Sequence, residues 1–344
     1  MTTGQRSTRV LLGVDGGNSK TDVALVAQDG RLLAALRGPT TSHQQVGLDP
    51  GADRLAALVN EAAARAGHTG RPVADVAVYA LAGADAAADH RRLARAFDAR
   101  AIARQNHVVN DAFAPLRAGT NRGWGITLIC GSGINAAGIA PDGRRARLAA
   151  LGPISGDWGG GGDLGLAALG AAVRARDGRG PRTTLETAVP AAFGLERPID
   201  LTWAIEVGRI EQARLRELSP VVFRAAQAGD AVATSIIDRQ ADELVVMAGA
   251  IIRRLGLTRR APDVVLAGGV LAANDARFEG RITNGIVAIA PGASVRRSDA
   301  LPVLGAALLA LDRLDGRAER DRRAAEERLR GTLGAWRPEA APSI

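Results

Sequence analysis

The sequence predicts a duplicated α/β fold, and a glycine-rich hairpin pattern that occurs twice is the main reason. Residues 15–20 (Asp-Gly-Gly-Asn-Ser-Lys) join two apolar runs, and residues 131–133 (Gly-Ser-Gly) join two more about 115 residues later. In each copy a turn signal at 28–30 or 141–143 leads to a third apolar run. Two strands, a tight loop and a third strand therefore open each half.

The segments after each hairpin predict the order βββαβαβα in both halves, from hydrophobic periodicity and from glycine or proline stops. The first half is predicted to contain a third strand at 31–36, helix 52–66, strand 75–81, helix 86–97, strand 106–110 and a helix from 112. The second has a third strand at 144–151, inserted helices at 163–176, 182–192, 200–218 and 230–256, strand 263–267, a helix after 268–269, strand 286–290 and helix 302–314.

The length of 344 residues is sufficient for two domains, each with its own core. We expect an N-terminal domain at 9–118 and a C-terminal domain at 119–314, whose closing helix can pack back on the first. Residues 315–344 are expected to form a charged helical tail with a disordered end. A solvated helix is one interpretation of this tail, and an oligomer contact is the other.

Composition excludes several classes of protein. The net charge is +8, but all except one of the 44 basic residues are arginine and aromatic residues make up only 3%, so no base-stacking platform for nucleic acid is present. No apolar run is long enough to span a bilayer, which predicts a cytoplasmic protein. A single cysteine, Cys130, lies in an apolar run and reads as a core residue, so disulfides, Cys-rich zinc sites and iron–sulfur clusters are excluded within one chain.

Both glycine loops suit phosphate, because glycine lets backbone N–H groups approach an anion and hydroxyls complete the cradle. The first loop is not a Walker A motif, since Ser19 rather than glycine precedes Lys20-Thr21. Residues 131–136 fit a dinucleotide fingerprint, but the turn at 141–143 ends the segment too early for its helix. Two such loops facing each other across a cleft can clamp a polyphosphate.

Four positions beside these loops carry candidate chemistry. Asp15 can be interpreted as a turn-forming residue or as a carboxylate beside a phosphate. Asp111 can be interpreted as a helix N-cap or as a reactive group at the end of a strand. The glycine-rich stretch around Asp157 is either a linker or a binding turn, and His43 alone is typical of a packed or surface histidine.

Four motifs in order, at residues 15–21, 110–112, 131–135 and 265–269, resemble the N-acetylglucosamine kinase branch of the BadF/BadG/BcrA/BcrD ATPase family. That family lies within the sugar kinase, Hsp70 and actin superfamily, so the resemblance implies two ribonuclease H-like domains. It also implies a homodimer that transfers phosphate from ATP, with Mg²⁺, to the 6-hydroxyl of N-acetylglucosamine.

The resemblance also assigns site residues. Asp111 would be the general base, and Asp15 would orient Mg²⁺ through water. ATP and its phosphates would be bound by Gly16, Gly17, Asn18, Ser19, Lys20, Gly131, Ser132, Gly133, Gly268 and Gly269, and the sugar by Ser42, His43, Gly152 and Asp157 together with Asp111.

Two departures from the family pattern leave the identity of the sugar substrate undetermined. Ser42 stands where the sugar kinases often have asparagine, and Trp158 replaces the usual glutamate, where it could cover a sugar face or plug the cleft. The alternatives are a kinase for glucosamine, glucose, N-acetylmannosamine or N-acetylmuramic acid, or an ATPase that activates a partner protein.

Overall fold

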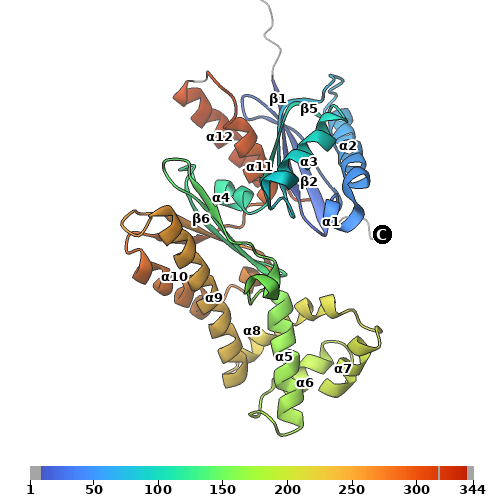
Figure 1. Ribbon diagram of the computed structural model, residues 1–344, viewed down its shortest axis with the longest axis vertical. Coiled ribbons are helices and arrows are strands. Elements are labelled where there is room, and N and C mark those ends of the chain that lie inside the picture. The colour runs from blue at the N-terminus through green and yellow to red at the C-terminus, as the bar shows by residue number, and fades with distance from the viewer. Residues whose placement is uncertain (1–8, 317, 339–344) are drawn as a thin grey trace, which may run out of the picture. The chain divides into compact units, whose positions relative to one another are not determined.

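The computed structural model describes residues 9–316 and 318–338, which form two compact units (Figure 1). Unit 1 consists of the described residues up to Gly123 and those from Ser298 onward. Unit 2 consists of Trp124–Arg297. Each unit contains a five-stranded mixed sheet, ordered β3-β2-β1-β4-β5 in unit 1 and β8-β7-β6-β9-β10 in unit 2. Because the two orders correspond strand for strand, the predicted duplicated α/β fold is confirmed.

In unit 1 the third strand and the helices follow the predicted order. Its elements are β1 (Val10–Gly16), β2 (Lys20–Ala27), β3 (Leu32–Pro39), α1 (His43–Val46), α2 (Leu48–Arg65), β4 (Ala74–Leu81), α3 (Ala87–Asp98), β5 (Ala103–Asn110), α4 (Phe113–Gly119), α11 (Pro302–Leu311) and α12 (Glu319–Gly334). Strand β1 is antiparallel to β2 and parallel to β4, and β4 is parallel to β5. The carboxyl ends of β1, β4 and β5 therefore lie at the same edge of the sheet.

The sheet of unit 1 is covered on both faces. Leu12 and Val14 of β1 belong to the core formed with α2 and α3. The alternate residue, Gly13, faces α11 so closely that a Cβ there would overlap the backbone of Ala307. Side chains alternate along a strand, so Asp15 lies on the same face of β1 as Gly13.

Helix α12 packs on unit 1 through Ala325, Leu329 and Leu333, which are buried. The carbonyl of Ala325 lies so close to Gly30 that a Cβ at this position would overlap it. Gly30 also has a φ of +85°, a conformation that favours glycine. The prediction of a solvated helix therefore holds only for the outer face of α12, because its inner face is buried. Helices α11 and α12 belong to unit 1, and the expected ranges allowed the closing helix to pack on that part of the chain. The expected disorder at 339–344 lies outside the described residues.

A buried arginine fastens α12 to the rest of unit 1. Arg117 of α4 is 6% exposed and donates hydrogen bonds to Asp312 at 2.8 and 3.1 Å and to Glu326 of α12 at 2.8 Å twice. Arg330 donates to Glu326 as well, at 3.0 Å. Such a network satisfies charges that would be costly to bury alone.

Unit 2 carries the predicted helical insertion. Its elements are β6 (Gly125–Cys130), β7 (Ile134–Ile139), β8 (Arg145–Arg147), η1 (Gly152–Ser155), α5 (Gly161–Arg176), α6 (Leu185–Ala191), α7 (Pro198–Glu206), η2 (Gln212–Leu218), α8 (Ser219–Gln227), α9 (Ala231–Leu255), β9 (Asp263–Ala267), η3 (Gly269–Ala273), α10 (Ala276–Ile289) and β10 (Ser294–Arg297). Helix α9 packs on β6, β7 and β8 and against α5, α8 and α10.

Two segments of unit 2 differ from the prediction. The strand expected at 286–290 is wrong, because most of it belongs to α10, where Phe278, Ile282 and Ile286 form one buried face at a spacing of four. The sheet strand is β10, a few residues later. The helix expected at 200–218 ends at Glu206, and α8, which the pattern did not predict, follows η2.

Asp230 gives the fold a measurable dependence on pH. Its carboxylate caps α9 by accepting hydrogen bonds from the N–H groups of Val232 and Ala233, both at 2.9 Å, and it also accepts hydrogen bonds from Thr183 and Thr184. Burial alone would raise the pKa of Asp230, but these hydrogen bonds outweigh it and lower the pKa to about 2.

We expect Asp230→Ala to lower the free energy of unfolding by roughly 1–2 kcal/mol at pH 6. Because the folded pKa lies below the usual value of about 3.9, the ionised carboxylate stabilises the fold above about pH 4, and this contribution disappears as the pH falls through about 2. Urea unfolding at pH 6 and pH 3 measures the gap between wild type and variant, which should narrow at pH 3. Asp230→Asn, which keeps a cap without the charge, is the control; a gap for the alanine variant that does not change with pH would contradict this role.

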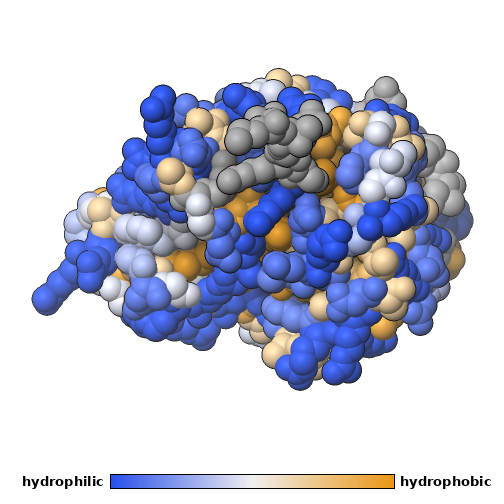
Figure 2. Space-filling view, turned by 90° about the horizontal axis from the view of Figure 1, so that it is seen from above, coloured by the Kyte–Doolittle hydropathy of each residue, from blue (hydrophilic) through white to orange (hydrophobic). Residues whose placement is uncertain are grey.

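Within the described ranges no helix has both the length and the apolar character needed to cross a bilayer. Hydrophilic residues cover most of the face seen in Figure 2.

Candidate active site

The first glycine loop is a tight hairpin turn. Gly17 N–H donates to Lys20 carbonyl at 3.0 Å, which leaves Asn18 and Ser19 exposed at the tip. The segment after β3 supports it, since Thr40 Oγ1 donates to Gly17 carbonyl at 2.9 Å and Ser42 Oγ donates to Asn18 Oδ1 at 2.7 Å. Ser42 is 5% exposed, so the structure shows this predicted sugar ligand holding the loop in place.

A row of charged side chains crosses the sheet beside this loop. Asp15 of β1 lies opposite Asp22 of β2, which lies opposite Arg37 of β3. Arg37 donates two hydrogen bonds of 2.7 Å to Asp22, which compensates that buried carboxylate. For Asp15, burial and then the charges of Asp22 and Asp111 raise the pKa to about 7, although Lys20 and Arg37 act in the opposite direction.

Burial, and after it the charges of Asp22 and Asp111, favour the neutral form of Asp15 when no cation is nearby. A divalent cation would supply the missing positive charge and favour the ionised carboxylate. Mg²⁺ is commonly bound by one or two carboxylates, phosphate oxygens and water, so it needs no cage of protein ligands. The described residues contain no cluster of three or more acidic, histidine or cysteine ligands, and Asp15 fits the Mg²⁺ mode of binding.

Asp111 follows the carboxyl end of β5. Its N–H donates to Leu81 carbonyl of β4 at 3.2 Å, and its carbonyl accepts from Ala114 N–H at 3.2 Å. Since Asp111 also contributes to the raised pKa of Asp15, the structure brings these two predicted carboxylates together in unit 1. The side chain of Asp111 is partly buried.

Asn110 is a positioning residue to which sequence reasoning gave no role. It is 3% exposed; its amide Nδ2 donates to Asp85 Oδ1 at 3.0 Å, and its Oδ1 accepts from Ala112 N–H at 3.1 Å. These bonds fix the turn that carries Asp111. His43, the first residue of α1, is half-buried and interacts electrostatically with Asp89 at the start of α3.

The second glycine loop, in unit 2, is held by the glycine-rich segment that opens α5. Gly131 N–H donates to Gly133 carbonyl at 2.9 Å and closes the loop. Gly161 N–H donates to Gly131 carbonyl at 2.8 Å, and Gly162 N–H donates to Ser132 carbonyl at 3.0 Å. A Cβ added at Gly131 or Gly133 would meet nothing within 4 Å, so the outer side of this loop is open to a ligand.

A cavity of about 140 Å³ in unit 2 brings four predicted residues together. It is lined by Ser132 and Gly133 of the second loop, Gly152 and Asp157 of the following segment, and five further residues. The Asp157 carboxylate accepts a hydrogen bond from Ser155 and is half-buried. The segment around Asp157 is therefore an ordered wall of this cavity, and the linker interpretation is wrong.

Trp158 has a neighbour that the sequence did not indicate. The guanidinium carbon of Arg239 lies 3.8 Å from the centre of the Trp158 ring, a cation–π contact. The ring also packs against the core of unit 2 and does not line the cavity. In this structure Trp158 fills space beside the cavity, and the arginine covers one face of its ring.

Gln240 is a further residue of this site that the sequence analysis missed. It is fully buried on α9, and its Oε1 accepts from Gly160 N–H at 2.5 Å. Gly160 has a φ of +85°, and a Cβ there would overlap Gly133. One feature of the sequence could have indicated Gln240. It is a single amide on a helix face whose neighbouring buried residues, including Ile237 and Leu244, are apolar.

The late glycine pair lies beside the second loop. Gly268, with a φ of +111°, packs so closely on Cys130 carbonyl that a Cβ would overlap it, while Gly269 faces open space. Cys130 is buried, and burial raises the pKa of its thiol to about 12. It is the core residue that the sequence predicts, and its thiol is unsuited to metal binding.

Two sheets of one strand order, each with a glycine loop after its first strand, define the duplicated fold of the sugar kinase and actin-like ATPases. A family model described as the BadF/BadG/BcrA/BcrD ATPase family matches residues 12–310. The chain belongs to that family, as its motifs predict.

Relatives with similar sequences include two amino-sugar kinases. The chain is 26% identical over 317 residues to the N-acetyl-D-glucosamine kinase of Dictyostelium discoideum, covering 89% of this chain and 99% of that protein. It is 29% identical over 264 residues to the N-acetylmuramic acid/N-acetylglucosamine kinase of Clostridium acetobutylicum, covering 76% and 86%. A crystal structure of a candidate N-acetylglucosamine kinase from Chromobacterium violaceum is similar with a TM-score of 0.70 and 25% identity, over 88% of this chain and 99% of that one.

Proposed function

We propose that this protein is an ATP-dependent kinase that phosphorylates N-acetylglucosamine at its 6-hydroxyl. The observation that carries the proposal is the placement of Asp15 and Asp111 at one sheet edge of unit 1, close enough for one charge to raise the pKa of the other, beside the hairpin Gly17–Lys20. Phosphoryl transfer needs positioned donors, charge compensation and a base for the attacking hydroxyl. The kinase relatives support the same reaction.

Each unit supplies part of the machinery. In unit 1, the exposed N–H groups and hydroxyl of the first loop bind phosphate oxygens, and Lys20 adds a positive charge. In unit 2, the second loop and Gly269 offer open backbone to the nucleotide, while Asp157 accepts hydrogen bonds from sugar hydroxyls. Asp15 would hold Mg²⁺ through water, and the bound ion would neutralise charge on the phosphates.

Asp111 accepts the proton of the 6-hydroxyl as the sugar oxygen attacks the γ-phosphorus. The new O–P bond forms while the bond to the β,γ-bridging oxygen breaks, and ADP leaves with that electron pair. Asn110 holds the turn that carries the base, and Ser42 holds Asn18 at the tip of the first loop. The enzyme is proposed to act as a cytoplasmic homodimer.

The alternative, an ATPase that activates a partner protein, receives less support from this chain. Activators of that kind in the family hold an iron–sulfur cluster through cysteines at a subunit interface. Cys130 is the only cysteine in the sequence, and it is completely buried.

Substrate choice tests the proposal. We expect kcat/KM for N-acetylglucosamine to exceed that for glucose by about tenfold or more, which corresponds to about 1.4 kcal/mol, because a site built for an amide leaves polar groups unpaired when the acetyl group is missing. Coupled ADP release should be compared for N-acetylglucosamine, glucose, glucosamine, N-acetylmannosamine and N-acetylmuramic acid, with a sugar-free control. Equal or better use of glucose or glucosamine would refute the N-acetyl preference.

A further inference from the structure

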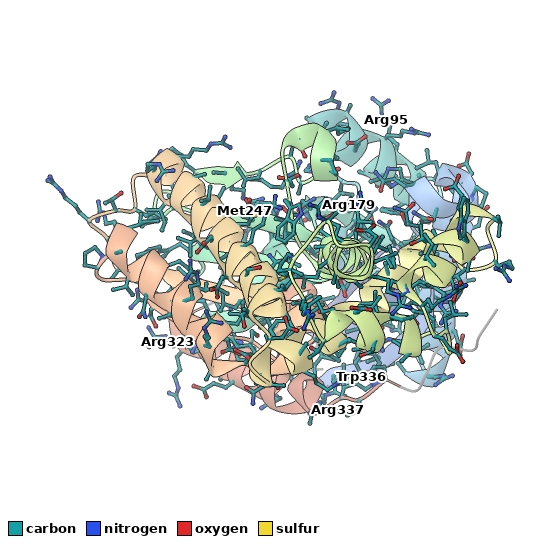
Figure 3. All side chains as sticks on the ribbon, turned by 90° about the horizontal axis from the view of Figure 1, so that it is seen from below. Arg95, Arg179, Met247, Arg323, Trp336 and Arg337 are labelled. Atoms are coloured by element: carbon teal, nitrogen blue, oxygen red, sulfur yellow. The ribbon has the colours of Figure 1, made fainter. Side chains whose placement is uncertain are left out.

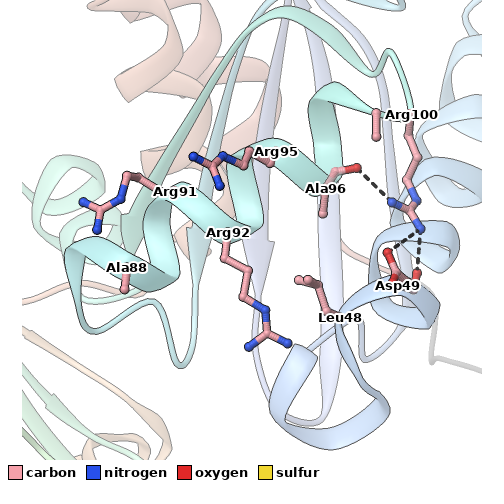
Figure 4. Close-up of a pocket in the computed structure, with 9 residues that line it drawn as sticks. Leu48, Asp49, Ala88, Arg91, Arg92, Arg95, Ala96 and Arg100 are labelled. Atoms are coloured by element: carbon pink, nitrogen blue, oxygen red, sulfur yellow. Dashed lines mark hydrogen bonds and ion pairs between the residues drawn. The ribbon is translucent and has the colours of Figure 1, made fainter.

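One pocket in the described part of the chain is not used by the proposed reaction. It has a volume of about 550 Å³ and lies in unit 1, between α3 and the start of α2 (Figure 4). Four arginines and one aspartate line it, together with Leu48 and small alanine side chains of α3. The volume lies within the range of small-molecule sites, and the lining is strongly positive.

One arginine of the pocket has a structural role, because its guanidinium is already hydrogen-bonded within unit 1. Arg100 donates to Asp49 Oδ1 at 3.3 Å and to Ala96 carbonyl at 2.9 Å (Figure 4). It also donates to Asp53 Oδ1 at 2.7 Å. These bonds tie the end of α3 to the first turns of α2. They also occupy the one acidic side chain of the lining, Asp49, so this acid does not compensate the other arginines.

The remaining three arginines of the lining are available. Arg91, Arg92 and Arg95 are exposed on α3, where Arg95 lies four residues after Arg91 and three after Arg92, and within the described residues none of them pairs with an acid. Arg92 extends toward Leu48 in Figure 4, and Arg95 projects outward from its helix in Figure 3. By contrast, arginines on α10 and α12, such as Arg281 and Arg323, pair with neighbouring acids.

Like charges at this spacing destabilise a helix by a few tenths of a kcal/mol unless an anion joins them. We propose that this pocket binds a small anion that carries two or more phosphate charges. Guanidinium groups recognise phosphate through paired N–H donors and remain charged at all relevant pH values. Exposed arginine side chains change rotamer quickly, so three of them can converge on one ligand, while Leu48 and the alanines contact its uncharged part. The site is independent of the proposed kinase reaction.

Calorimetric titration of the full chain tests the site, with pyrophosphate and fructose 1,6-bisphosphate as probes in Mg²⁺-free buffer. We expect the combined variant R91Q/R92Q/R95Q to weaken one binding event by about tenfold or more. The matched control is R182Q/R209Q/R259Q, which removes the same charge from three exposed arginines that have no recorded partner and do not line this pocket. Neither variant changes a glycine loop, so nucleotide-site binding of a probe persists in both.

The two probes distinguish the source of the phosphate groups. Tighter binding of the bisphosphate assigns the pocket to an organic phosphate ester, and tighter binding of pyrophosphate assigns it to an inorganic polyphosphate. Identical isotherms for wild type and the pocket variant, or an equal loss in the control variant, would overturn the proposal. Neither variant should unfold at a lower temperature than wild type, because all six side chains are exposed.

Discussion

Asp111→Asn is expected to lower kcat for N-acetylglucosamine phosphorylation by about 10² to 10⁴ while binding of ATP and sugar is retained. Asparagine has nearly the same shape, and the backbone bonds of Asp111 to Leu81 and Ala114 do not depend on its side chain. It cannot accept the hydroxyl proton. Steady-state kinetics measure kcat, and calorimetry measures the affinity for each substrate separately.

A fall in kcat at unchanged affinity would assign Asp111 to the chemical step. Thermal unfolding provides the control, since a lower melting temperature would indicate a damaged turn around Asn110 instead. Retention of more than a tenth of the wild-type kcat would show that another group, or water, removes the proton.

Arg117→Met should destabilise the protein by about 3–5 kcal/mol, the largest effect on stability that we expect. The substitution removes a buried cation whose hydrogen bonds hold Asp312 and Glu326, and so leaves two carboxylates with incomplete compensation. Helix α12 should loosen, because Glu326 is one of its links to α4. Urea unfolding measures the change.

Arg328→Met, which removes an arginine of α12, is the matched control. Arg328 pairs with Asp29 at 2.8 Å, but both side chains are about half exposed, so its loss should cost less than about 1 kcal/mol. A similar, small change for Arg117→Met and Arg328→Met would contradict the role of the buried network.

The sequence was most informative where structure is local. Glycines, turn signals and alternating apolar residues were sufficient to predict both hairpins and their loops at 15–20 and 131–133. The strand orders of the two sheets confirm the duplication. The strand expected at 286–290 failed because a short apolar run does not distinguish a strand from one face of a helix. The buried surface of α12 depends on its contact at Gly30, which is remote in sequence.

The candidate site shows the same limit. Asp15 and Asp111 could be predicted because each follows an apolar run and matches a motif. The pairing of Arg37 with Asp22, which lies beside Asp15, could not be predicted, because it depends on strand register. The bond from Gly160 to Gln240, which supports the second glycine loop, could not be predicted either, because it joins residues 80 positions apart. Ser42 illustrates the reverse case: it was predicted to bind the sugar, and in the structure its hydroxyl donates to Asn18.

The central claim is that this chain transfers phosphate from ATP to a sugar. The direct measurement is phosphorus and carbon NMR of the products formed from ATP, Mg²⁺ and N-acetylglucosamine, with ADP quantified in the same sample. We predict one phosphate ester at C6 for each ADP released, and no comparable ADP release without the sugar. Release of ADP and inorganic phosphate without a sugar phosphate would contradict the kinase assignment and favour an ATPase.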